Sequence, residues 1–195
     1  MFLSPFIKEI LPYAIAAIMA AWLIVCAIYD QKTQEVPTPL TLIPLIAAVL
    51  ITIAKGNYVL AGLVIVIYLI GDISKKWMGL ILAIIATGAV FVWTLFHAGT
   101  FDGLATTVMI LALWLYWYFG KAGGADINIL VTITLILGIW ATVSAILIGG
   151  LVAIAIWKAL KKDKKEALPF VMPLAIGTIL YLVINLIPSL VGGII

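Results

Sequence analysis

Long stretches of apolar residues, separated by short polar breaks, fill this chain from about residue 10 to residue 186. Of its 195 residues, 66% are hydrophobic and only 10% are charged, whereas a soluble domain carries roughly a quarter charged residues. A helix of roughly 20 apolar residues crosses a bilayer. We therefore predict an all-α fold, a polytopic membrane helical bundle embedded in the lipid bilayer, as a single domain over residues 1–195.

The polar breaks define the ends of the predicted spans. Apolar runs cover about 10–29, 40–54, 58–71, 77–96, 101–119, 126–159 and 169–186. The run over 126–159 is too long for one ordinary span and short for two. We expect it to break at Gly138 or within 142–144.

The lysines decide whether that long run is one span or two. With eight spans and the N-terminus outside, nine of the eleven lysines lie on the cytoplasmic side, and only Lys8 and Lys55 lie outside. This bias is the one that the positive-inside rule describes, and it nearly vanishes if the run is one helix. We therefore predict about eight transmembrane helices, with the sixth and seventh short, and place Asp30 and Asp126 on the cytoplasmic side.

Composition excludes several kinds of site. All basic residues are lysines, and no basic face shows interleaved aromatic residues, so nothing indicates a nucleic-acid partner. A single cysteine, Cys26, excludes an internal disulfide and a multi-cysteine zinc site. The only histidine, His97, falls on the outer side in the eight-span topology. We expect packing or solvation for both residues, and we predict no metal and no cofactor.

Three aspartates, Asp30, Asp72 and Asp126, each adjoin an apolar run on the predicted inner side. A carboxylate at the edge of the hydrocarbon layer is costly and needs a reason. The plain interpretation is an interfacial or helix-capping carboxylate, which suits Asp72 because Ser74, Lys75 and Lys76 follow it. Asp126 is open to the same interpretation, as the N-cap of the next helix.

The sequence Gly123-Gly124-Ala125-Asp126 favours a second interpretation. Residues without bulky side chains just before a carboxylate let another backbone approach, and an unwound peptide substrate at a membrane surface needs such a place for its amides. Two facing carboxylates that share one proton hydrolyse an amide: one activates water and the other polarises the carbonyl. Asp30 and Asp126 are the candidate pair.

These residues resemble the prepilin peptidases, the class III signal peptidases, which are membrane aspartyl proteases of the GxGD type. The likeness rests on Asp30 followed by Glu35-Val36-Pro37 and Leu40 to Pro44, on Gly123 to Asp126, and on the segment from Leu168 to Pro173. It departs at Ala125, where the name of the class puts Gly and archaeal-looking members have this change, and at Asn128, where many bacterial members carry Lys. The four-cysteine cytoplasmic domain of those members is missing, so a small, protease-only, archaeal-type member fits best.

The resemblance implies an aspartic endopeptidase without N-methyltransferase activity in the cell membrane. Its catalytic residues would be Asp30 and Asp126, and its partners would be pilin-like or archaellin-like precursors with class III signal peptides, cut at the cytoplasmic boundary. We expect Gly123 and Gly124 to contact the substrate, and Glu35 or Asp72 to attract the basic leader.

Two other functions stay open. A small ion- or proton-coupled transporter could use the same aspartates as a cation site, with the glycines marking a broken helix. A membrane scaffold without catalysis is the third interpretation, and it leaves the aspartates unexplained. For the aromatic cluster at 114–119, interfacial anchoring or packing is favoured over substrate binding.

Overall fold

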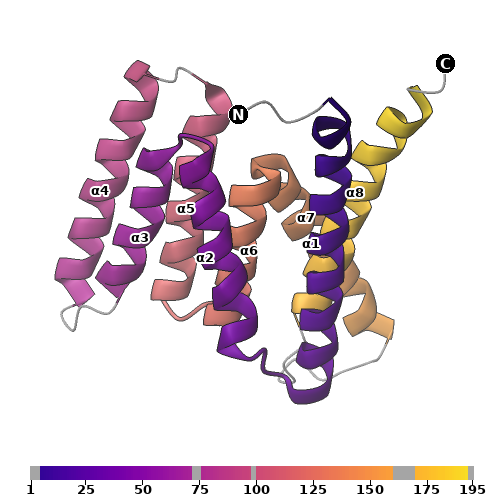
Figure 1. The fold of residues 1–195 in the computed structure, drawn as a ribbon. Helices are drawn as coiled ribbons and strands as arrows, with labels where there is room; N and C mark the ends of the chain where they lie inside the picture. Colours follow the sequence, from indigo (N-terminus) through magenta and orange to yellow (C-terminus); the bar gives the residue numbers. More distant parts are fainter. Residues whose placement is uncertain (1–4, 72–75, 98–99, 160–169, 193–195) are drawn as a thin grey trace. The chain divides into compact units, whose positions relative to one another are not determined.

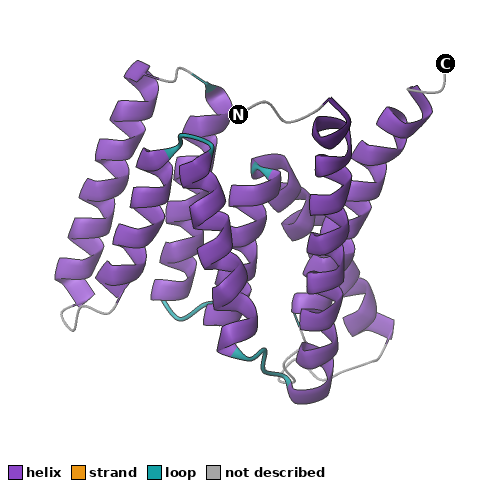
Figure 2. Cartoon of the chain, viewed as in Figure 1, coloured by secondary structure: helices purple, strands orange, loops and turns teal. Residues whose placement is uncertain are grey.

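The computed structural model describes residues 5–71, 76–97, 100–159 and 170–192, and every regular element in those ranges is a helix (Figures 1 and 2). The eight described helices are α1 (Pro5–Thr33), α2 (Thr38–Ala54), α3 (Tyr58–Gly71), α4 (Lys76–His97), α5 (Phe101–Tyr118), α6 (Gly124–Leu137), α7 (Ile139–Ala159) and α8 (Val171–Gly192). The predicted all-α class is therefore confirmed. Four of the helices, α1, α4, α5 and α7, are long and apolar enough to span a membrane.

The long apolar run breaks at Gly138, one of the two expected places. Gly138 ends α6 with φ of 90°, a left-handed conformation that favours glycine, and α7 begins at the next residue. The prediction that both helices are short is half wrong. The helix α6 has 14 residues but α7 has 21, because α7 continues through 142–144 without interruption.

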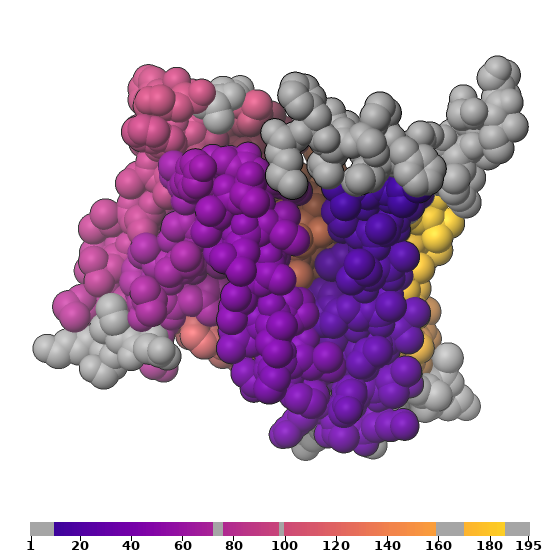
Figure 3. Space-filling model, in the orientation of Figure 1, coloured from indigo at the N-terminus to yellow at the C-terminus, as the bar shows by residue number. Residues whose placement is uncertain are grey.

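The chain groups into two compact units. Unit 1 consists of residues 1–36 and 143–195, and unit 2 consists of residues 37–142. Large apolar side chains lie exposed on both units: Ile18 on α1 is 68% exposed, Ile43 on α2 is 66% exposed and Leu69 on α3 is 68% exposed. Figure 3 shows one face of the surface, coloured along the sequence. Such surfaces are the ones a bilayer covers, so the chain is a membrane protein with several apolar helices.

The helix α6 forms the centre of unit 2. Every residue from Ile127 to Leu135 is buried, as expected for a helix that is apolar on all sides. One amide, that of Asn128, is buried among them and is satisfied from two neighbouring helices. Tyr68 on α3 donates its hydroxyl to Asn128 Oδ1 at 2.7 Å, and Asn128 Nδ2 donates to Thr41 Oγ1 on α2 at 3.2 Å. This network fixes the first turns of α2 and α6 side by side (Figure 1).

Small residues set the packing within unit 1. A Cβ atom added at Gly177 of α8 would lie 2.8 Å from the carbonyl oxygen of Ala145, and one added at Gly149 of α7 would lie 2.7 Å from that of Pro173. Glycine at these two positions therefore lets α7 and α8 approach backbone to backbone, a common form of packing between membrane helices. The helix α1 packs along α8 in the same unit.

Candidate functional site

Asp30 lies three residues before the end of α1, and its side chain is only 7% exposed. The backbone N–H of Val171, the first residue of α8, donates to Asp30 Oδ2 at 2.8 Å. The amide of Met172 also donates to this carboxylate. The first amides of a helix have no partner within that helix and carry its positive dipole end. Asp30 therefore caps α8, although 141 residues separate it from Val171.

The segment that follows Asp30 turns sharply. Gln34 adopts φ of 56°, and the Thr33 hydroxyl donates to the carbonyl oxygen of Glu35 at 2.6 Å. The Gln31 side chain donates to the sulfur of Met172 at 2.7 Å, which adds a second link to α8. Glu35 is exposed, so its carboxylate is accessible to a charged partner in solution.

Asp126 lies in the first turn of α6 and is half-buried. Gly123 occupies the N-cap position, so the interpretation of Asp126 itself as the N-cap is wrong: the helix starts at Gly124, two residues before the carboxylate. A carboxylate at this third helical position is still favoured by the helix dipole. Asp126 and Asp30 therefore share one property, a carboxylate near the N-terminus of a helix.

Gly123 has a reason that the sequence did not show. A Cβ atom at this position would lie 3.3 Å from Asp126 Oδ2, closer than side-chain carbons ordinarily come to another atom. The missing side chain thus makes room for the carboxylate of Asp126. At Gly124 a Cβ atom would lie 3.6 Å from Trp117 Nε1, an ordinary contact distance. Contact of either glycine with a substrate stays a prediction.

The aromatic cluster at the end of α5 packs against glycines. Trp114 is 2% exposed and stacks on Tyr118 with ring centroids 4.6 Å apart. The Trp117 ring occupies the space where Gly71 lacks a side chain, since a Cβ atom there would lie 2.8 Å from it. The Tyr118 hydroxyl donates to the carbonyl oxygen of Lys76. Packing is therefore the role of these three rings, while Tyr116 and Phe119 are exposed.

The remaining candidates are placed as follows. Asp72 lies outside the described residues. Cys26 is completely buried, and the ring of His97 stacks on Trp93 with centroids 3.8 Å apart. In the described part of the chain, no three His, Cys, Asp or Glu side chains gather as metal ligands would.

Asp30 belongs to unit 1 and Asp126 to unit 2, so their pairing stays a prediction. Sequence reasoning missed two partners: the Val171 amide on Asp30, and the Tyr68–Asn128–Thr41 network two residues after Asp126. Asn128, a single amide side chain within the apolar run after Asp126, was the feature of the sequence that could have indicated this network. Comparison with protein-family models, curated proteins and solved structures finds no match to this chain.

Proposed function

We propose that the chain is a membrane aspartic endopeptidase that removes basic leaders from pilin-like or archaellin-like precursors at the cytoplasmic boundary. Asp30 and Asp126 act as its catalytic pair. One observation carries the proposal: the hydrogen bond between Asn128 and Thr41 fixes the start of α6 beside the start of α2. The chain that leaves Asp30 enters α2 within eight residues, so it joins unit 2 at the end where Asp126 lies.

The mechanism follows from the chemistry of two carboxylates that share one proton. The ionised carboxylate takes a proton from water as the water oxygen attacks the scissile carbonyl carbon. The protonated carboxylate donates a hydrogen bond to the carbonyl oxygen and then supplies a proton to the leaving amine. The scissile amide of the precursor lies at the membrane boundary in this proposal, where the substrate helix can unwind and its backbone groups can find polar partners.

The leader is recognised by charge in this proposal. Glu35 is exposed on the segment that follows Asp30 and is available to a basic leader. Asp72 is the second candidate and lies outside the described residues. Replacing Glu35 by Lys lowers cleavage of a lysine-rich leader and spares a precursor whose leader lysines are replaced by alanine. Equal cleavage of both precursors by the variant removes this role.

The decisive assay uses the purified protein in detergent with a precursor that carries a basic leader before an apolar helix. Asp30→Asn and Asp126→Asn each remove one ionisable group and keep its size. We expect each to lower the cleavage rate by about 10²–10⁴-fold, the usual contribution of an acid–base group. Asp163→Asn, in the lysine-rich segment before α8, is the matched control and cleaves normally. Wild-type cleavage by either Asp30→Asn or Asp126→Asn rules out the proposed pair.

A further inference from the structure

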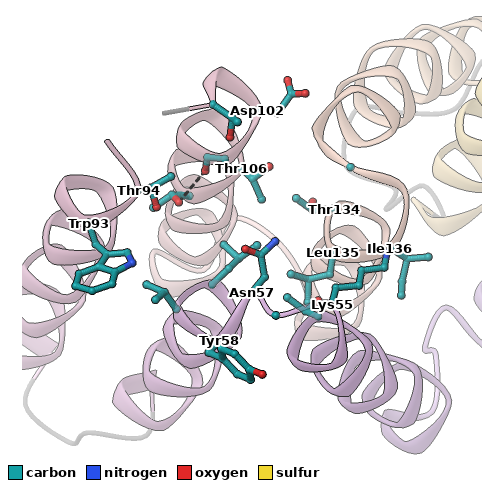
Figure 4. Close-up of a pocket in the computed structure, with 18 of the residues that line it drawn as sticks. Lys55, Asn57, Tyr58, Trp93, Thr94, Asp102, Thr106, Thr134, Leu135 and Ile136 are labelled. Carbon is teal, nitrogen blue, oxygen red and sulfur yellow. Dashed lines mark hydrogen bonds between the residues drawn. The ribbon is translucent and has the colours of Figure 1, made fainter. Parts of the chain in front are cut away.

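Unit 2 contains a cavity of about 510 Å³ at the end of the unit where α2 and α6 end and α3 and α5 begin (Figure 4). This is the end opposite the first turn of α6, so the cavity is separate from the Asp126 region. Its volume lies in the usual range for small-molecule sites. Its lining combines charged, hydroxyl and aromatic side chains: Lys55, Asn57 and Asp102 are exposed, whereas Thr52, Thr107 and Thr134 are buried.

Buried threonines give the inner wall a definite hydrogen-bonding character. The hydroxyls of Thr52, Thr107 and Thr134 donate to backbone carbonyls one turn earlier in their own helices, at 2.8, 2.9 and 2.7 Å. Each of the three residues is at most 3% exposed. Because their protons are already committed, their oxygens offer mainly acceptor lone pairs, although the Thr134 oxygen already accepts from the Thr142 hydroxyl at 2.8 Å, so Thr52 and Thr107 are the stronger acceptors. Such a wall suits a ligand group with N–H donors.

Charges of both signs line the same cavity. Lys55 follows the last residue of α2 and Asp102 lies in the first turn of α5, so the positive and the negative charge of the lining come from different helices (Figure 4). Among the described residues neither makes an ion pair or a side-chain hydrogen bond. Asn57, beside Lys55, adds an amide donor. A ligand that satisfies this lining carries an anionic group for Lys55 and Asn57, and an ammonium group for Asp102 and the threonines.

We propose that this cavity binds a zwitterionic phosphate ester of a primary amine, of the phosphoethanolamine type. The phosphate oxygens accept from Lys55 and Asn57, and the primary ammonium donates to Asp102 and the threonine oxygens. A quaternary ammonium has no N–H to donate, so the site discriminates against choline esters. The same chemistry is available from a phospholipid headgroup at the membrane interface and from the free phosphate ester.

Lipid retention tests the proposal. The protein is reconstituted in nanodiscs with equal amounts of phosphatidylethanolamine and phosphatidylcholine of identical acyl chains, transferred to mild detergent, and weighed with its retained lipid by native mass spectrometry. We expect the wild type to prefer phosphatidylethanolamine by about tenfold, the effect of one charge-assisted hydrogen bond. Thr107→Val and Asp102→Asn abolish the preference, and Thr107→Ser keeps it.

The matched control is Thr87→Val. Thr87 is 4% exposed and donates to the carbonyl of Ala83 at 2.8 Å, as the cavity threonines do, but it does not line the cavity. Calorimetric titration of the delipidated protein with phosphoethanolamine separates the two sources: binding identifies the free ester as a ligand, and its absence beside lipid preference identifies the headgroup. The proposal fails if neither ligand is preferred, or if Thr107→Val and Asp102→Asn behave like Thr87→Val.

Discussion

Asp30 and Asp126 both lie near the start of a helix, but they reach that position in different ways. Asp30 comes from the end of α1 and accepts hydrogen bonds from the first amides of α8, a contact that spans 141 residues. Asp126 lies in the first turn of its own helix, where Gly123 leaves space for its carboxylate. A contact across 141 residues therefore holds the first carboxylate, and a glycine three residues earlier in the chain makes room for the second.

The largest expected difference is in stability. Asp30→Ala leaves the amides of Val171 and Met172 without their acceptor, so we expect the free energy of unfolding to fall by about 2 kcal/mol. Asp126 is half-buried and lies in the first turn of its own helix, so we expect Asp126→Ala, which removes a carboxylate favoured by the helix dipole, to cost less than Asp30→Ala. Unfolding by sodium dodecyl sulfate in mixed micelles, followed by circular dichroism, measures both. Equal losses contradict a larger stabilising role for the contact between Asp30 and the start of α8.

Packing around α8 gives the next effect. Gly177→Ala brings a methyl group to 2.8 Å from the carbonyl oxygen of Ala145, so the two helix backbones must separate. We expect a loss of about 1–2 kcal/mol in the same unfolding assay. Gly88→Ala on α4 meets no atom within 4 Å and is the control; it gains up to about 0.5–1 kcal/mol from helix propensity. A neutral Gly177→Ala shows that α7 and α8 do not need this close approach.

The local positioning of Asp126 is tested at Gly123. Gly123→Ala places a methyl group 3.3 Å from Asp126 Oδ2 and displaces the carboxylate. We expect cleavage of a basic-leader precursor to slow by about tenfold, because small misplacements of a reacting group are costly. The free energy of unfolding falls by about 0.5–1 kcal/mol, because alanine is a poor N-cap residue. Gly88→Ala serves again as the control and cleaves at the wild-type rate. Normal cleavage by Gly123→Ala separates the glycine from catalysis.

The smallest effect concerns the network behind Asp126. Tyr68→Phe removes the hydroxyl that donates to Asn128 Oδ1. Hydrogen bonds between membrane helices contribute about 0.6 kcal/mol on average, so we expect a loss of that size. Tyr116→Phe, at a residue 54% exposed on α5, is the control and changes the unfolding free energy less. An equal effect at the two tyrosines means that the network does not stabilise unit 2.

The helices were predictable because their ends depend on local chemistry. Apolar runs set their length, and breakers such as Pro37 and Gly138 set where they start or stop. The sequence predicts too short an α7 because the polar residues Thr142 and Ser144 suggest a helix break. In the structure, the hydroxyl of Thr142 on α7 lies 2.8 Å from that of Thr134 on α6, and the two form a hydrogen bond. A threonine that finds a partner within a bundle does not interrupt a helix.

The partners of the aspartates were less predictable. The sequence indicated which carboxylates are unusual, because a charge beside an apolar run is costly. It did not indicate the Val171 amide, which depends on how α8 begins after a segment far along the chain. Nor did it show that Gly123 leaves space for the Asp126 carboxylate, since that space is needed only because the Asp126 side chain turns towards Gly123. Both facts belong to three-dimensional packing and not to any local pattern.

The central claim is that Asp30 and Asp126 form one site. Cross-linking tests it in a Cys26→Ala background, which removes the only native cysteine. Cysteines replace Asp30 and Asp126, a short bifunctional thiol reagent is added to membranes, and mass spectrometry identifies the joined peptides. We expect a cross-link between positions 30 and 126, and none between 30 and 102. If both cysteines react singly with a maleimide yet never join, with or without precursor present, the two aspartates do not form a common site.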